Sequence, residues 1–261
     1  MNTQVLVIAN QKGGVGKTTT ALSLAAALSI LKKKVLLIDI DPHACATVHL
    51  SIFQEDVRGS ILDIFRAGIT QDTEEKWQGI ITKSSRLPFD FVPSHVQLSY
   101  LDADLKETPG KGRILEQALK HLKGQYDYIL IDCPPYVGVL LVNALVCADL
   151  LIIPIQTDFL ALHGLRLLFD TMRVVNKATR KKTRFKALAT MFDQRASACR
   201  RVLQLLQTKV QKNFFRTVIN VDTKFREASA QGRVIFEVAP ASRGAKEYML
   251  LAKELLADEE S

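Results

Sequence analysis

The stretch Asn10–Thr20, with the sequence NQKGGVGKTTT, constrains the fold of this chain more than any other feature. It lies between a β-branched apolar run, Gln4–Ala9, and an alanine-rich segment with helical spacing, Thr18–Leu31. Glycines between a strand and a helix start allow backbone N–H groups to close around phosphate oxygens, and the helix dipole favours the negative charge. A plain glycine-rich turn is the alternative interpretation. The phosphate-loop interpretation predicts these nucleotide-binding residues: Gly13, Gly14, Val15, Gly16, Lys17, Thr18 and Thr19.

Two lysines stand in this loop where one is usual. Lys17 is placed to reach the β- and γ-phosphates, and the Thr18 hydroxyl to bind Mg²⁺. Gln11 occupies the position where the ordinary motif begins with glycine, and Lys12 adds a second lysine. Lys12 cannot easily reach the same nucleotide from the far side of a tight loop. On the residues alone, a solvated lysine is the simplest interpretation of Lys12.

Strand-like and helix-like segments alternate from end to end of the 261-residue chain. This order predicts one α/β domain, residues 1–261, with a doubly wound, mostly parallel sheet and helices on both faces. The expected strands are Gln4–Ala9, Lys34–Ile38, Phe89–Val92, Tyr128–Ile131, Leu150–Ile153, Phe185–Met191 and a short one near Thr217–Ile219. The expected helices are 18–31, 109–122, 138–147, 161–178, 197–211 and 242–257.

Aspartates follow two of these strands. Asp39 and Asp41 end the strand at 34–38, and Asp132 ends the strand at 128–131. Because ligands of parallel α/β sheets bind beyond the carboxyl ends of the strands, we expect all three near the phosphate loop. Such carboxylates orient a metal ion or an attacking water in phosphoryl transfer. His43 follows closely, but a lone loop histidine is more often solvated or structural.

Charge is unevenly distributed along the chain. The net charge is +8, but residues 171–216 hold thirteen Lys or Arg and a single acid, Asp193. A segment this one-sided predicts a polyanion-binding face, with an ordinary solvated surface as the alternative. The four cysteines form no C-x-x-C pair, which favours free thiols in a reducing cytosol. We also expect no membrane-spanning segment and a cytoplasmic location.

Three motifs of this chain resemble those of the ParA/MinD ATPases with a deviant Walker A motif. They are KGGVGKTT, LLIDIDP and YDYILIDCPP. Later blocks, such as IPIQTDFLALHGL and SRGAKEYMLLAKEL, are similar to the ParA/Soj branch. The resemblance implies a P-loop NTPase that binds ATP and Mg²⁺ and hydrolyses ATP slowly, stimulated by a ParB-like partner. It also implies that Lys12 reaches the partner's ATP in a sandwich homodimer, that Asp41 positions the hydrolytic water, and that Asp39 and Asp132 support the metal.

The resemblance further implies that the ATP-bound dimer binds double-stranded DNA without sequence preference, on the nucleoid, to segregate chromosomes or plasmids. Lys224 matches a position where relatives carry a DNA-binding arginine, and the other candidates follow from charge and place. They are Arg195, Arg200, Arg201, Arg216, Lys224 and Arg243. Two departures concern the switch loop, where relatives read Gln-Gly-Asn and this chain has His43-Ala44-Cys45, and Asn220, which replaces a proline near the adenine pocket.

Three other functions remain open on the sequence. A MinD-like membrane-cycling ATPase would use a basic amphipathic C-terminal helix, whereas this chain ends KELLADEES. An iron–sulfur reductase would need two cluster cysteines per subunit, and Cys133 is placed next to the strand-ending Asp132. A third possibility is an ATPase that positions a cargo other than DNA.

Overall fold

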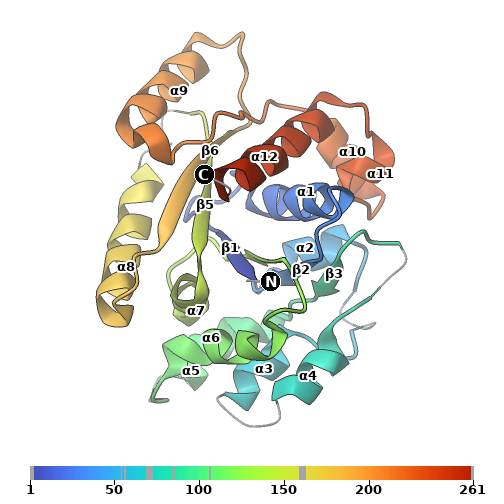
Figure 1. The fold of residues 1–261 in the computed structure, drawn as a ribbon, viewed down its shortest axis with the longest axis vertical. Helices are drawn as coiled ribbons and strands as arrows, with labels where there is room; N and C mark the ends of the chain where they lie inside the picture. The colour runs from blue at the N-terminus through green and yellow to red at the C-terminus, as the bar shows by residue number, and fades with distance from the viewer. Residues whose placement is uncertain are drawn as a thin grey trace.

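Six parallel strands form one sheet at the centre of the molecule (Figure 1). The structure, a computed structural model, describes residues 3–53, 55, 57–68, 73–83, 86–105, 107–158 and 163–259. The strand order is β3-β2-β4-β1-β5-β6, and each neighbouring pair is parallel, which confirms the predicted sheet. The strands are β1 Gln4–Ile8, β2 Val35–Asp39, β3 Asp90–Val92, β4 Tyr128–Asp132, β5 Leu150–Gln156 and β6 Arg184–Thr190.

Helices cover both faces of the sheet, with α1 and α12 side by side on one face and α6 and α7 on the other (Figure 1). The helices are α1 Lys17–Ile30, α2 Cys45–His49, α3 Ile61–Ala67, α4 Thr73–Ile80, α5 Leu101–Asp104, α6 Ile114–Leu119, α7 Val139–Cys147, α8 His163–Thr179, α9 Ser197–Val210, α10 Lys224–Ala230, α11 Ile235–Val238 and α12 Arg243–Glu259. Among the described residues, every helix is too short or too polar to span a bilayer.

Two hydrophobic cores follow from the alternation of side chains along the strands. In β1, Val5 and Val7 pack into the core beneath α6 and α7, whereas Leu6 and Ile8 pack into the core beneath α1 and α12. Successive side chains of a strand point to opposite faces, so a strand buried on both faces reads as a continuous apolar run. The first of these cores holds two of the cysteines.

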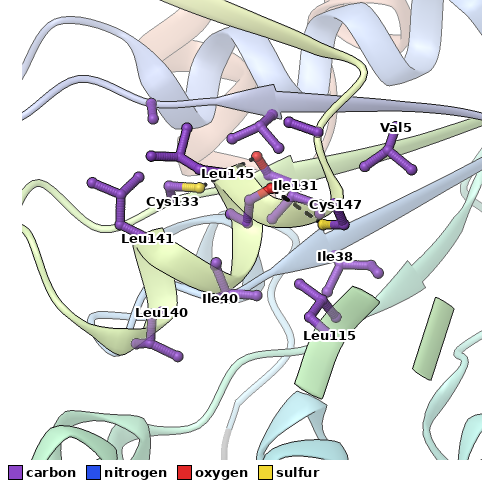
Figure 2. Close-up of a cluster of buried hydrophobic side chains, with 14 of the residues drawn as sticks. Val5, Ile38, Ile40, Leu115, Ile131, Cys133, Leu140, Leu141, Leu145 and Cys147 are labelled. Carbon is purple, nitrogen blue, oxygen red and sulfur yellow. Dashed lines mark hydrogen bonds between the residues drawn. The ribbon is translucent and has the colours of Figure 1, made fainter. Parts of the chain in front are cut away.

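Cys133 and Cys147 lie among aliphatic side chains of that core, with Cys133 beside Leu141 and Leu145 and Cys147 nearer to Ile131 (Figure 2). The Cys147 thiol donates to a carbonyl oxygen of its own helix, 3.2 Å away. Burial raises the pKa of each of the two thiols far above the usual value of a cysteine. Cys133 therefore acts as a small core residue here, and its thiol faces away from solvent.

The expected strand at Thr217–Ile219 was wrong. The segment runs beside β6, where Phe215 N donates a hydrogen bond to Ala187 O and Ile219 N donates one to Ala189 O, both at 2.9 Å. Between these two bonds, its backbone makes no hydrogen bond to β6. There, Arg216 N and Thr217 N donate instead to the Glu254 carboxylate of α12, at 2.7 and 2.9 Å. A carboxylate on a neighbouring helix thus takes the N–H groups that a strand would use.

Two expected helices have different limits. The helix expected over 109–122 is α6, flanked by 3₁₀ turns at Lys111–Arg113 and Lys120–Leu122. The helix expected over 161–178 is α8, and its expected first two positions, 161 and 162, lie outside the described residues. The remaining expected elements agree with the structure to within three residues.

Candidate active site

The three predicted aspartates meet at the carboxyl edge of the sheet. Asp39 of β2 and Asp132 of β4 are register partners, and Ile8 of β1 is the register partner of Asp132 on its other side. The phosphate loop leaves β1 at this point. One sheet edge therefore brings together a glycine-rich loop and buried carboxylates, as the order of the strands predicted.

The phosphate loop needs its glycines for backbone conformation. Gly14 and Gly16 have φ of 74° and 85°, in the left-handed region that side chains rarely adopt. Gly16 caps α1, and no side chain of the described residues bonds to the first N–H groups of this helix. Because these N–H groups have no partner within the helix, they are available to an anion.

Asn10 positions the start of the loop, which the sequence reasoning missed. Its side chain donates to Pro154 O at 2.7 Å, and its Oδ1 accepts from Lys12 N at 3.0 Å. Pro154 lacks an N–H and stands in β5 where the ladder with β1 has ended. The side-chain amide of Asn10 thus bonds to β5 beyond the point where the backbone ladder between β1 and β5 ends.

The two lysines of the loop have different surroundings. Lys17 is buried, and its ammonium donates to Lys12 O at 3.3 Å. Burial lowers the pKa of Lys17, while the charges of Asp132 and Asp41 oppose this shift. Lys12 forms an ion pair with Asp158, just beyond β5, so its side chain is held rather than free in solvent. No sequence pattern pointed to Asp158, which lies 146 residues away.

Asp39 and Asp132 are both fully buried but differ in their partners. Asp39 accepts from Thr47 N at 2.9 Å, from Thr47 Oγ1 at 2.7 Å and from Asp41 N at 3.0 Å. Burial raises the pKa of Asp39 to about 7, although the Thr47 bonds lower it. Neither Asp132 oxygen accepts a well-formed hydrogen bond from the described part of the chain, although the Thr18 hydroxyl lies close enough to lower the pKa of Asp132. Burial and the Asp39 charge outweigh this and raise that pKa well above its usual value.

This donor set fits a hard cation. The buried Asp132 carboxylate has two oxygens without a well-formed hydrogen bond from the described residues, and the Thr18 hydroxyl lies beside it. The described residues contain no group of three or more His, Cys, Asp or Glu side chains that could hold a metal alone. Mg²⁺ suits such a site, because it keeps waters and binds substrate phosphates together with few protein ligands.

Asp41 begins a tight turn beside Asp39. Its carbonyl oxygen accepts from Ala44 N at 2.8 Å and from Ser94 Oγ at 2.6 Å. Its carboxylate accepts from the backbone and faces the ring of His43. Ser94 N also donates to Thr47 Oγ1 at 2.9 Å, so this serine ties Asp41 directly, and Asp39 through Thr47, to the loop after β3. Sequence reasoning did not identify Ser94 or Thr47.

A cavity of about 460 Å³ opens beside the phosphate loop. It begins at Gly16 and Thr19 and extends over Met191, Asn220 and Phe225. Its volume falls in the range of small-molecule sites. The Asn220 side chain donates to Glu247 at 2.6 Å, so its amide nitrogen is already engaged at the cavity wall. A cavity of similar size lies at the amino ends of β5 and β6, away from the aspartates.

The predicted DNA-binding residues fall into three places. Arg200 and Arg201 are exposed on α9, and Arg195, 87% exposed, precedes this helix. Arg195 bonds to Asp193 and, with a smaller effect of Arg243, lowers the pKa of Asp193 to about 2. Arg243, at the start of α12, is near enough to Asp193 to contribute to this shift.

Lys224 and Arg216 complete the set. Lys224 begins α10 and pairs with Glu227 at 2.7 Å, while its backbone N–H and that of Gly244 in α12 both donate to Asp222. Arg216 is 84% exposed and lies in the segment beside β6, 3.6 Å from Glu254. The structure thus brings Lys224 and Arg243 to the loop at 221–223, keeps Arg195 with Asp193 before α9, and places Arg216 in a separate segment.

Comparisons with known proteins agree with this site. Residues 3–185 match the family model described as an AAA domain. The chain is 37% identical to the sporulation initiation inhibitor protein Soj of Bacillus subtilis over 98% of this chain and 99% of Soj. It is 32% identical to the chromosome partitioning protein ParA of Myxococcus xanthus over 97% of this chain and 88% of that protein.

A solved structure gives the same result for the fold. Cobyrinic acid a,c-diamide synthase from Mycobacterium smegmatis, solved with an ATP analogue and magnesium, superposes with a TM-score of 0.83. It is 30% identical and covers 99% of this chain and 96% of that one. With a deviant phosphate loop at the edge of a parallel sheet and nearly full-length similarity to Soj and ParA, this chain belongs to the ParA/Soj family of P-loop ATPases.

Proposed function

We propose that this protein is an ATP-dependent DNA-partitioning ATPase, formed by residues 1–261 as one domain. The observation that carries the nucleotide part is the uncapped start of α1 beside the unpartnered Asp132 carboxylate. Together they suit a phosphate–Mg²⁺ group, which supplies the reactive phosphoryl and the counter-charge when bound.

The site residues have separate roles in this proposal. Lys17 and the loop N–H groups bind the phosphates, and Thr18 holds the metal with support from Asp39 and Asp132. Asp41 orients the attacking water, because its carboxylate lies at the same edge and is less completely buried than its neighbours. The base occupies the cavity beside Gly16 and Thr19.

Lys12 connects hydrolysis to assembly. In the proposed dimer it leaves Asp158 and reaches the ATP of a second copy, so nucleotide stabilises a sandwich of two chains. Slow hydrolysis, accelerated by a ParB-like partner, then separates the dimer. Exposed arginines on α9 and at the start of α12, together with Lys224 at the start of α10, support non-specific binding of the dimer to DNA phosphates on the nucleoid.

The test is binding to an arbitrary duplex, at low and high salt, with ATP or with ADP. We expect binding only with ATP, an affinity that falls steeply with salt, and loss of binding in Lys12→Ala. Lys34→Ala, which removes the same charge at the amino end of β2, should bind as the wild type does. Binding that ignores the nucleotide, or that persists in Lys12→Ala, would contradict the ATP-switched dimer; no binding at all would point to a membrane or protein cargo.

A further inference from the structure

The side chain of His43 folds back onto the carboxylate of Asp41. The ring Nδ1 lies 3.0 Å from Asp41 Oδ1, and the His43 backbone N–H donates to the same oxygen at 2.9 Å. The His43 side chain is 70% exposed and that of Asp41 only 8%. We propose that His43 is a positioning residue that holds the Asp41 carboxylate in one orientation for ATP hydrolysis.

The backbone around this pair leaves little freedom to the main chain of Asp41. Ala44 N and Ser94 Oγ both donate to Asp41 O, which closes a turn across Pro42 and His43. Ala44 has φ of 52°, in the left-handed region that residues with a Cβ rarely adopt, so the surrounding bonds hold this turn. The remaining freedom is the rotation of the carboxylate, and the His43 ring acts on that rotation.

The two oxygens of Asp41 are used differently. Both His43 donors use Oδ1, and nothing in the described residues donates to Oδ2. An ionised carboxylate only accepts hydrogen bonds, so the ring contact requires a proton on His43 Nδ1. Oδ2 is then left to accept from a water. This rests on the proposed function, in which Asp41 orients the attacking water.

The charged groups around Asp41 also act on the orientation of its carboxylate, which the His43 ring restrains. The Asp41 charge lies close enough to Asp39 and Asp132 to help raise the pKa of each of them. The Lys17 ammonium is also near enough to attract the Asp41 charge. A carboxylate between like charges and one ammonium has more than one favourable orientation when it is unrestrained. A donor fixed on Oδ1 selects one of them.

The experiment measures ATP turnover and ATP-analogue affinity of the full-length chain with His43 replaced. We expect His43→Ala to lower kcat about five- to tenfold, because a catalytic group loses its orientation while its backbone bond remains. The Kd for a non-hydrolysable ATP analogue should change less than twofold. His43→Gln should restore most of kcat, since its amide can donate to the same oxygen. His121→Ala, an exposed histidine in the 3₁₀ turn after α6, is the matched control.

Each other result has a definite meaning. Unchanged kcat in His43→Ala would overturn the positioning role, and so would a loss of analogue affinity as large as the loss of kcat. A His43→Gln variant as slow as His43→Ala would show that a donor on Oδ1 does not matter. Wild-type protein that hydrolyses no ATP would overturn the proposed function, and only that outcome would remove both proposals together.

Discussion

Asp132 shows how one residue can lower stability in order to serve a ligand. Its carboxylate is fully buried without a well-formed hydrogen bond from the described residues, and its pKa is raised. An acid whose pKa is higher in the folded than in the unfolded state loses stability as the pH rises from its unfolded value, about 3.9, through its folded value. In the nucleotide-free protein, the contribution of Asp132 to the free energy of unfolding should therefore be less favourable at pH 8 than at pH 5.

Asp132→Asn tests this directly. The variant removes the buried charge, so its melting temperature without nucleotide should exceed the wild-type value at pH 8 by roughly 2–8 °C, for about 1–3 kcal/mol. The gain should be smaller at pH 5, and ATP turnover should fall about 10- to 100-fold. Calorimetry at the two pH values measures the first effect, with exposed Asp104→Asn as the control. A variant less stable than the wild type at pH 8 would contradict a destabilising role for this charge.

At the scale of single elements, the segment at 214–220 depends on one side chain of α12. The Glu254 carboxylate accepts from Arg216 N, Thr217 N and Thr217 Oγ1 at 2.7–2.9 Å, and it is buried. Glu254→Ala would leave these donors without a partner, at a cost of about 2–4 kcal/mol. We expect the melting temperature to fall by roughly 5–10 °C, whereas Lys253→Ala on the exposed side of α12 should leave it unchanged. Equal melting temperatures would show that water replaces the carboxylate.

A second prediction at this scale concerns helix α9 and the affinity for duplex DNA rather than the stability of the fold. Replacing Arg200 and Arg201 with alanine should lower the affinity for duplex DNA in the presence of ATP. The slope of log affinity against log salt should fall by about 0.9 for each DNA phosphate that the variant no longer neutralises. The same change of charge on α8, Arg173→Ala with Lys177→Ala, is the control. An unchanged slope in the α9 variant would place the DNA face elsewhere.

These elements also show what a sequence can predict and what it cannot. The helix α1 and strand β4 were predicted to within a residue or two, because glycine, alanine and β-branched residues act locally. The phosphate loop and the three aspartates followed from the rule that parallel strands end at one edge. The partner of Lys12 and the fate of the 214–220 segment depend on Asp158 and Glu254, which lie 146 and about 37 residues away in the chain. The hydrophobic periodicity of a segment does not identify a partner that is so far away in the chain.

At the scale of the whole molecule, the basic residues and the carboxylates of the nucleotide site lie in different places. The carboxylates that surround the nucleotide site lie at the carboxyl edge of the sheet, whereas the basic excess of residues 171–216 begins in α8 and continues through β6 and α9. Many of these cations are engaged locally, as Lys186 is with Asp258 and Arg173 with Asp170. In the proposed DNA binding, the arginines with exposed side chains on α9 should therefore contribute more than the total charge does.

The central place of β1 determines when the site can first exist during synthesis. Of the six strands, β1 is synthesised first, yet its neighbours are β4 and β5, whose paired residues begin at Tyr128 and Leu150. At a synthesis rate of about 5–20 residues per second, the first strand waits roughly 6–25 seconds for the first of these partners. Throughout that interval the nascent chain carries an apolar strand and a phosphate loop with no sheet to hold them. A shortened chain that ends before β4 would keep the complete loop sequence and yet have no nucleotide site.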